Sequence, residues 1–299
     1  MTDTLNPFFL VYDSRSGSTF LAKCMVKDLD LVIPPESNFL DRILIKFPKA
    51  VIENRKELSA VIEIINGDEK FKDWRIDLNL LYDCHLPVKI NEFVSKILNL
   101  YGSGSGYGVK KGNLIYRHAE LGRLFPESKF ICIVRDGRAV YSSKKISLHS
   151  KTGKPFDTDP VNAARKWVTI TKLMNEIENE NRGIAVKYED LIQTPNRVIN
   201  RIAGYLSLSA VGDNSRNGYV VPLRYSGLHE NINNSPMVEN IQKWRKYLRK
   251  DEIFLFEREA YETLVDEGYK PIFTRNELDN SIRYWWVLLK LKVRDNLFN

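Results

Sequence analysis

The sequence predicts an α/β fold: a single domain with a central parallel sheet flanked by helices and a P-loop-like strand–loop–helix near its start. Short apolar runs alternate with longer amphipathic segments, which is the pattern of strands and helices in such proteins. The composition supports a packed core, because 43% of the 299 residues are hydrophobic and 28% are charged. Ligands of parallel sheets bind where the strands end, so residues directly after predicted strands are candidates for the site.

The apolar run from Phe8 to Tyr12 ends at a polar turn that contains glycine, which predicts a buried strand. The first half of the chain continues with these predicted elements: a helix at 18–29, a strand at 29–33 stopped by two prolines, helices at 38–47, 55–65 and 88–100, a short strand at 107–110 and a helix at 115–124.

The run from Lys129 to Val134 is the clearest buried strand of the chain. The second half continues with these predicted elements: a helix from about 137, a long amphipathic helix at 160–179, a strand at 184–187, an irregular segment at 207–236 and a return to helix at 237–267. Because strands and helices alternate, the sheet should be parallel and covered on both faces.

The charge balance suits an anionic ligand without naming it. The chain has 45 lysines and arginines against 38 aspartates and glutamates, a formal net charge of +7. A slightly basic solvated surface explains this surplus equally well. Basic and acidic residues are interspersed, so we expect no nucleic-acid partner.

The sequence lacks the features of secreted or membrane-spanning proteins. Its start shows no basic segment followed by an apolar one, and no apolar run reaches the roughly 18 residues of a spanning helix. Cys24, Cys84 and Cys132 lie far apart and form no C-x-x-C pair. We therefore expect a cytoplasmic protein without a disulfide framework or a structural zinc site.

The segment from Asp13 to Thr19 has the composition of a phosphate cradle. Small residues let the backbone curl around a ligand, and the following helix presents unpaired N–H groups to an anion. Ser18 stands where a Walker A loop requires lysine, and the basic residue of this turn is Arg15. An ordinary strand-to-helix turn is the alternative interpretation.

A second candidate anion site follows the strand that ends at Val134. Arg135 offers a planar fork suited to phosphate, and Ser143 lies about two helical turns further on. A solvated basic helix start is the alternative. Two anion sites at two strand ends suit a nucleotide with two separated phosphate groups.

Together these segments resemble the sulfotransferases that use 3′-phosphoadenosine-5′-phosphosulfate (PAPS). Four family motifs occur in the family's order: Arg15-Ser16-Gly17-Ser18-Thr19 for [KR]-S-G-[ST]-[ST], Arg135 with Ser143 eight residues later, Tyr188-Glu189-Asp190-Leu191 for Y-E-D-L, and Trp244-Arg245 with Leu248 for W-[RK]-x-x-L. The matches span roughly residues 8 to 269, so the resemblance covers most of the chain.

The resemblance implies the sulfotransferase fold, PAPS as donor, adenosine 3′,5′-bisphosphate as product, and no metal. Arg15 would neutralise the bridging oxygen as the S–O bond breaks. The remaining donor-binding roles are these: Ser16, Gly17, Ser18 and Thr19 for the 5′-phosphosulfate, Arg135 and Ser143 for the 3′-phosphate, Tyr188 near the adenine, and Arg245 as a further positive charge.

The general base is not carried over from the cytosolic family members, which use a histidine in a K-T-H segment. The comparable stretch here, Val109 to Asn113, has no histidine. Glu36 follows the second strand, where several bacterial and carbohydrate sulfotransferases place a catalytic glutamate, so we predict it as the base. A glutamate favoured by a helix dipole is the alternative. Lys110 matches a family lysine near the transferred group and is the third predicted catalytic residue.

The function predicted is transfer of a sulfuryl group to a hydroxyl or amine of a small-molecule, lipid-like or carbohydrate acceptor. A P-loop kinase or other nucleotide-dependent phosphotransferase is the alternative, and a non-catalytic basic module for nucleic acid or membrane is a third. We expect the segments 66–87, 149–159 and 207–236 to shape the acceptor pocket. The lack of a membrane anchor suggests a soluble, bacterial-type member.

The domain prediction is a sulfotransferase domain at 1–270 and an amphipathic helical extension at 271–299. The apolar residues that share one face of this extension are Ile282, Trp285, Trp286, Leu289 and Val293. Docking on the domain or on a second copy, as in a homodimer, is the expected role. Contact with a membrane surface is the lesser alternative.

Overall fold

The computed structural model describes residues 6–149, 152–208, 219–222, 238–280, 282, 284–286 and 289. Contacts divide the chain into two compact units. The first takes in residues up to Val134 and again Met174–Asn234, and the second takes in Arg135–Leu173 and Ser235 onwards. Each unit is described by itself.

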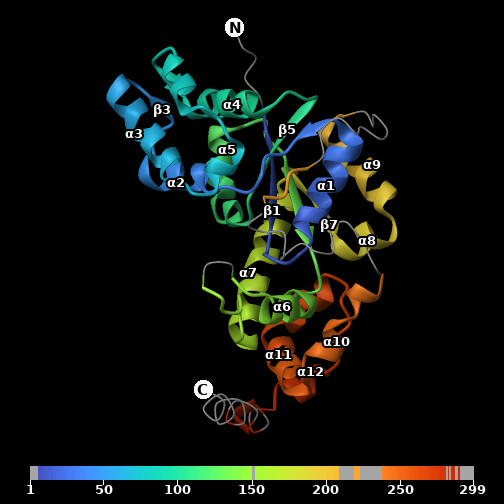
Figure 1. The fold of residues 1–299 in the computed structure, drawn as a ribbon. Coiled ribbons are helices and arrows are strands. Elements are labelled where there is room, and N and C mark those ends of the chain that lie inside the picture. Colours follow the sequence, from blue (N-terminus) through green and yellow to red (C-terminus); the bar gives the residue numbers. More distant parts are fainter. Residues whose placement is uncertain are drawn as a thin grey trace. The chain divides into compact units, whose positions relative to one another are not determined.

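In the described residues of the first unit, a five-stranded parallel sheet has the order β2-β5-β1-β6-β7 (Figure 1). The central strand β1 aligns Leu10 with Lys110 of β5 and with Ile131 of β6. This sheet confirms the predicted fold class. Its strands are β1 Phe8–Tyr12, β2 Leu31–Val32, β5 Gly106–Lys110, β6 Phe130–Val134 and β7 Gly183–Lys187.

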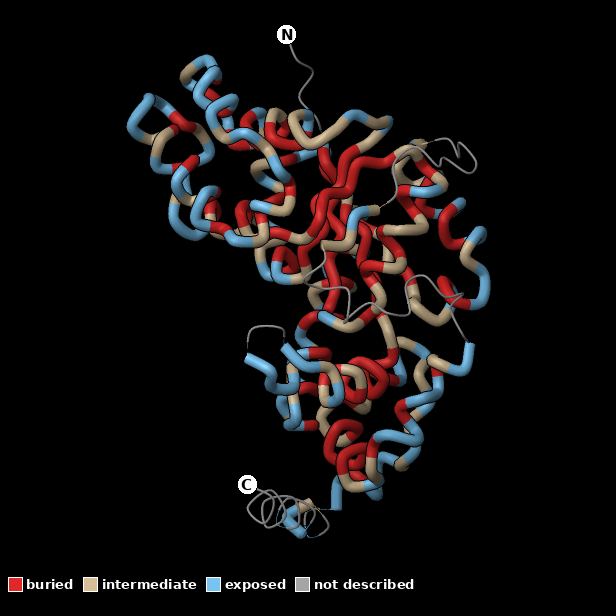
Figure 2. Tube along the Cα trace, viewed as in Figure 1, coloured by how far each residue is buried: buried red, intermediate tan, exposed pale blue. Residues whose placement is uncertain are grey.

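Successive side chains of β1 point to opposite faces of the sheet and pack against the helices on each face. Phe8, Leu10 and Tyr12 belong to one buried cluster together with residues of α1, α8 and α9. On the other face, Phe9 meets the ring of Phe125 edge-on, with 5.4 Å between ring centroids. The strands form the mostly buried centre of this unit in Figure 2, and β1 and β6 are buried at every residue.

The helices of the first unit are α1 Ser18–Leu29, α2 Phe39–Lys46, α3 Arg55–Asn66, α4 Ile90–Tyr101, α5 His118–Leu124, α8 Tyr188–Gln193 and α9 Pro195–Leu206. The shorter elements are the 3₁₀ helices η1 Phe71–Trp74, η2 Leu78–Asp83 and η3 Gly112–Arg117, and the antiparallel pair β3 Val51–Ile52 and β4 Val88–Lys89. The sequence did not predict α8 or α9.

The second unit packs helices around buried aromatic rings. Its core includes Trp167, Trp244 and Phe256. A Cβ on Gly137 would lie 2.5 Å from the Trp167 ring, so the first residue of α6 must be glycine. The elements are α6 Gly137–Ile146, α7 Pro160–Asn179, which continues into the first unit, η5 Val238–Ile241, α10 Trp244–Tyr247, α11 Lys250–Asp266 and α12 Arg275–Leu278.

The return to helix predicted at 237–267 is present as three separate helices, η5, α10 and α11. Leu248 is extended, with a ψ of 138°, and its buried side chain fills the core. Arg249 then precedes α11, and its backbone N–H donates to Oε2 of Glu252 at 3.0 Å. The strand predicted at 29–33 is shorter than expected, because Asp30 is left-handed (φ 47°) at the end of α1.

Two other predictions fall partly outside the described residues: the irregular segment 207–236 and the extension 271–299. Of the predicted apolar face, Ile282, Trp285, Trp286 and Leu289 are exposed. Val293 lies outside the described residues. The domain boundary at 270 stays a prediction. None of the helices in the described part of the chain is long and apolar enough to cross a membrane.

A buried ion-pair network holds the start of α6 to α11 within the second unit. Arg138 donates to Asp136 at 2.8 Å and to Glu257 at 2.6 Å. The Glu257 side chain is fully buried and also accepts the backbone N–H groups of Ile272 and Phe273. The Arg138 guanidinium lies 4.2 Å from the centre of the Trp244 ring.

We predict that Arg138→Met lowers the free energy of unfolding by about 3–5 kcal/mol, because it leaves the Glu257 carboxylate buried without its charge partner. Urea unfolding measures the change. Arg165→Met is the matched control: Arg165 pairs with Glu259 on the surface, where an ion pair contributes little. Equal losses in the two variants would contradict the importance of the buried network.

Candidate active site

The loop between β1 and α1 is tightly curled and conformationally strained. Arg15 and Gly17 both have left-handed backbones, with φ of 74° and 90°. A non-glycine residue pays roughly 1–2 kcal/mol for this conformation, and such residues concentrate at functional sites. The N–H of Ser16 donates to the carbonyl of Asp13 at 3.2 Å and closes the turn.

Gly17 cannot be replaced without moving a neighbour. A Cβ at this position would lie 2.3 Å from Cδ2 of Tyr188, so the Tyr188 ring packs directly on the loop. Gly17 is also the N-cap of α1 and offers no side chain to its first-turn N–H groups. Ser18 and Thr19 are buried at that helix start. A helix start that receives no side-chain bond from its N-cap, beside a close backbone turn, is suited to bind an anion.

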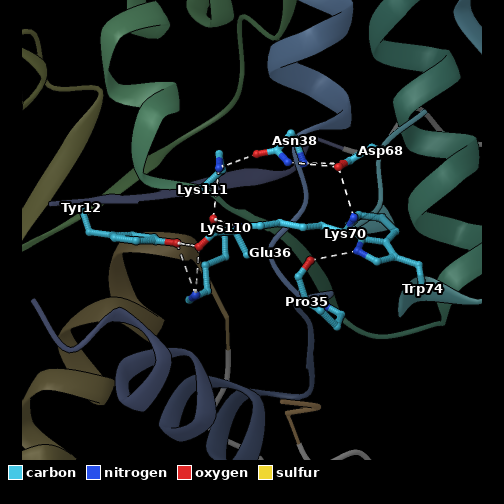
Figure 3. A network of polar contacts seen from close by, with 9 residues as sticks. All are labelled: Tyr12, Pro35, Glu36, Asn38, Asp68, Lys70, Trp74, Lys110 and Lys111. Carbon is cyan, nitrogen blue, oxygen red and sulfur yellow. Dashed lines mark hydrogen bonds and ion pairs between the residues drawn. The ribbon is translucent and has the colours of Figure 1, made fainter. Parts of the chain in front are cut away.

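A cluster of charged and polar side chains surrounds Glu36 (Figure 3). Lys70 and Lys111 donate to its Oε1 at 2.9 Å and 3.0 Å. Tyr12 donates its hydroxyl to Oε2 at 2.6 Å, and Nζ of Lys110 lies 4.0 Å from the same oxygen. Three ammonium groups and one phenol therefore meet at a single carboxylate in the described part of the chain.

Parallel-strand register explains how these residues come together. Tyr12 is the last residue of β1, and Lys110 is the last residue of the neighbouring strand β5. Glu36 follows β2, which pairs with the other edge of β5. The carboxyl ends of these strands point to the same edge of the sheet, where ligands bind in such folds.

Two pKa values in the cluster lie below their usual range, for different reasons. Burial alone would raise the pKa of Glu36, but the charges of Lys110, Lys111 and Lys70 together hold it well below its usual range. Burial lowers the pKa of Lys110 to about 8, although the Glu36 carboxylate opposes this change. Glu36 is therefore an anion throughout the neutral pH range. Lys110 loses its proton just above that range, near pH 8.

A second layer of contacts fixes the two lysines that contact Oε1. Lys111 also donates to Oδ1 of Asn38 at 2.7 Å. The Asn38 side chain in turn donates to Asp68 at 3.0 Å, and Asp68 accepts the backbone N–H of Lys70 at 3.2 Å. This layer links the segment after β2 to the segment that carries Lys70.

Sequence reasoning found Glu36 and Lys110 but missed Tyr12, Lys70 and Lys111. Lys70 lies in the segment 66–87, which was expected to shape the acceptor pocket, so its region was identified without the residue. Tyr12 precedes the predicted loop from Asp13, and Lys111 follows the predicted Lys110. Only their side-chain contacts with Glu36 show that they belong to the cluster.

Three predicted donor-binding residues belong to the second unit. Arg135 follows β6, is half-buried, and donates to the carbonyl of Asn240 at 3.4 Å. Ser143 is half-buried in α6. Arg245 is exposed on α10, stacks over Trp244 at 4.6 Å and donates to Gln242 at 2.6 Å. The predicted roles of all three stay predictions.

The comparisons with known proteins identify the family. The model of the sulfotransferase family matches residues 7–212, more than half of the chain. The chain therefore belongs to the sulfotransferase family. This confirms the predicted family and the predicted enzyme class, and it disfavours the P-loop kinase alternative.

Two relatives are protein-tyrosine sulfotransferases by name. Protein-tyrosine sulfotransferase 2 of Gallus gallus is 29% identical over 150 residues, which is 48% of this chain and 39% of that protein. A Caenorhabditis briggsae protein named as a candidate protein-tyrosine sulfotransferase is 38% identical over 88 residues, which is 29% of this chain and 31% of that protein. The matches thus span well under half the length of these relatives.

Two solved structures share the fold. The sulfotransferase domain from the curacin biosynthetic pathway superposes with a TM-score of 0.62 at 16% identity, covering 89% of this chain and 98% of that domain. The sulfotransferase domain of the Synechococcus PCC 7002 olefin synthase gives a TM-score of 0.52 at 20% identity, covering 86% of this chain and 96% of that domain.

We predict that the lowered pKa of Lys110 appears in the pH dependence of stability. Above pH 8 the folded protein releases the Lys110 proton while the unfolded chain still holds it, so the unfolded state binds more protons and stability rises with pH. Relative to Lys110→Met, the wild type should gain about 2 kcal/mol between about pH 8 and about pH 9.5.

Urea unfolding of both proteins across this range measures the difference. Glu36→Gln is the second comparison: because the Glu36 carboxylate raises the pKa of Lys110, its removal should move the rise to lower pH. Parallel stability curves for the wild type and Lys110→Met would show that the pKa of Lys110 is not lowered.

Proposed function

We propose that this sulfotransferase moves a sulfuryl group from PAPS to a hydroxyl or amine of its acceptor by in-line transfer. The observation that carries the proposal is the pairing of an anion cradle after β1 with the Glu36 cluster at the ends of neighbouring strands. The cradle suits a phosphosulfate, and the carboxylate suits the acceptor that attacks it.

The donor end of the site is assigned to the loop after β1. The close approach of Tyr188 to Gly17 and the uncapped start of α1 fit an anionic group held by backbone N–H groups. Arg15 would act as a fixed charge on the leaving oxygen, because a guanidinium does not give up its proton. The roles of Arg135, Ser143, Tyr188 and Arg245 toward the nucleotide follow from the motif resemblance.

In the proposed reaction the acceptor oxygen or nitrogen attacks sulfur, and the bond from sulfur to the 5′-phosphate oxygen breaks. The acceptor proton passes to Glu36, and adenosine 3′,5′-bisphosphate leaves. Catalysis in such transfers comes mainly from positioning and from stabilising charge on the leaving oxygens. Lys110, at the end of β5, would place positive charge beside the transferred group.

The electrostatics of Glu36 bear on the acceptor. A carboxylate whose pKa lies well below its usual range is always ionised but is a weak base. A phenol, with a pKa near 10, releases its proton more readily than an alkyl alcohol. A tyrosine hydroxyl is therefore a second acceptor candidate beside small-molecule, lipid-like and carbohydrate hydroxyls, and the names of the two relatives favour it.

We further propose that the protein acts in the cytoplasm and needs no nucleic-acid partner. A homodimer and contact of the C-terminal segment with a membrane surface are the two partner proposals that follow from its apolar and basic residues.

A sulfate-transfer screen with mass detection tests the function. It should include a tyrosine peptide, an alkyl alcohol, a carbohydrate and an amine, each with PAPS. A thermal-shift comparison separates the alternatives, since a sulfotransferase should be stabilised by adenosine 3′,5′-bisphosphate and a kinase by ATP with Mg²⁺. Stabilisation by ATP with Mg²⁺ alone would overturn the proposal.

We predict that Gly17→Ala, Arg15→Ala and Arg135→Ala each weaken binding of adenosine 3′,5′-bisphosphate by about tenfold or more, the loss expected for a charge-assisted contact. Gly17→Ala acts through its φ of 90° and the nearby Tyr188 ring. Isothermal calorimetry measures the affinities. Gly204→Ala is the matched control, because a Cβ there meets nothing within 4 Å. Wild-type affinity in all three variants would exclude the assigned donor site.

We predict that Glu36→Gln lowers kcat by about 10²-fold or more, the usual contribution of a general base, while the affinity for adenosine 3′,5′-bisphosphate changes little. Steady-state kinetics on an acceptor from the screen measures both kcat and KM. Asp41→Asn is the matched control, since Asp41 pairs with Arg117 instead of the lysine cluster. Unchanged turnover in Glu36→Gln would remove Glu36 as the base.

A further inference from the structure

The Tyr12 hydroxyl lies between Glu36 and Lys110. It donates to Oε2 of Glu36 at 2.6 Å and accepts from Nζ of Lys110 at 3.3 Å. Its strand, β1, ends at Tyr12 and runs directly into the loop from Asp13 to Gly17 that is assigned to the donor.

The strand holds Tyr12 firmly in this place. Tyr12 is the last residue of β1, is only 6% exposed, and packs in the cluster between the sheet and α1. Lys110 lies 5.0 Å from the centre of its ring. The carbonyl of Tyr12 lies so close to Gly112 that a Cβ there would approach it to 2.5 Å. A side chain fixed at both ends provides a rigid point of attachment for Glu36.

Without the Tyr12 hydroxyl, the carboxylate would be held asymmetrically. Lys70 and Lys111 both bind Oε1, whereas the nearest lysine to Oε2 is Lys110 at 4.0 Å. The Tyr12 phenol is thus the short hydrogen bond to Oε2 that complements the two lysine contacts to Oε1. Together these contacts determine the orientation of the carboxylate plane.

We propose that Tyr12 is a positioning residue for sulfuryl transfer: its hydroxyl orients the Glu36 carboxylate, and its place at the end of β1 fixes that carboxylate relative to the donor loop that follows the strand. The inference rests on the proposed function for the role of Glu36. It adds a residue that acts on turnover through Glu36 and does not itself bind the donor or the acceptor.

A double-mutant cycle tests this coupling. In the wild-type background, Tyr12→Phe should lower kcat by about 10- to 100-fold, the cost of misplacing a reacting group by a fraction of an ångström to 1 Å. In the Glu36→Gln background the same substitution should change kcat by less than about twofold. Tyr107→Phe, a tyrosine on the neighbouring strand β5, is the matched control and should leave kcat at its wild-type value.

Two further measurements separate positioning from a structural role. Binding of adenosine 3′,5′-bisphosphate to Tyr12→Phe should stay within about twofold of wild type, and the acceptor KM should change less than kcat. A crystal structure of Tyr12→Phe, which requires no turnover, should show the Glu36 carboxylate rotated toward Lys70 and Lys111, with its wild-type orientation kept in Tyr107→Phe.

The outcomes distinguish this inference from the proposed function. An equal loss of kcat from Tyr12→Phe in both backgrounds would overturn the positioning role and leave sulfuryl transfer intact. An unmoved carboxylate in the crystal structure of Tyr12→Phe would also overturn it. If the acceptor screen fails, the proposed function fails, while the crystal structures still decide whether Tyr12 orients Glu36.

Discussion

The Glu36 carboxylate joins its own segment after β2 to three other segments of the first unit. Tyr12 reaches it from the end of β1, Lys110 and Lys111 from the end of β5, and Lys70 from the segment after α3. No two of these segments are joined by a short turn, so the contacts require the strand order and register of the whole sheet. The carboxylate in turn offsets the repulsion between ammonium groups that the sheet brings together. The strand arrangement that builds the site therefore also requires a carboxylate at position 36 to offset the charges that it brings together.

The two ends of the proposed site solve different electrostatic problems. In the proposed site, the loop after β1 would hold an anion with backbone N–H groups of a tight turn and with the charge of Arg15. The Glu36 cluster uses full charges at short distance, which keeps the carboxylate ionised at the cost of base strength. In the proposed reaction such a carboxylate would be a weak base, so its direction toward the acceptor hydroxyl would matter for proton transfer.

The sequence predicted the sheet and the loop well, because both have local signals. A buried strand is a run of apolar residues, and the turn of Arg15 and Gly17 is a run of small residues before a helix. The Glu36 cluster is harder to predict, since the distance in sequence between Glu36 and Lys111 is 75 residues. Lys70 looked like a surface lysine of a loop, and Tyr12 like an ordinary strand residue. The break at Leu248 has no local signal, because a buried leucine suits a helix and a helix boundary equally well.

The coupling between Glu36 and Lys110 also limits how substitutions can be interpreted. A buried ammonium group is costly, and the Glu36 carboxylate offsets part of that cost by raising the pKa of Lys110. Removing the carboxylate takes a shared negative charge away from three lysines, while removing Lys110 relieves repulsion on Lys70 and Lys111. The two substitutions thus change the same local field in opposite senses. Their effects on stability will not add, and only the double variant can divide the effect of Glu36 on turnover from its effect on the charge balance of the fold.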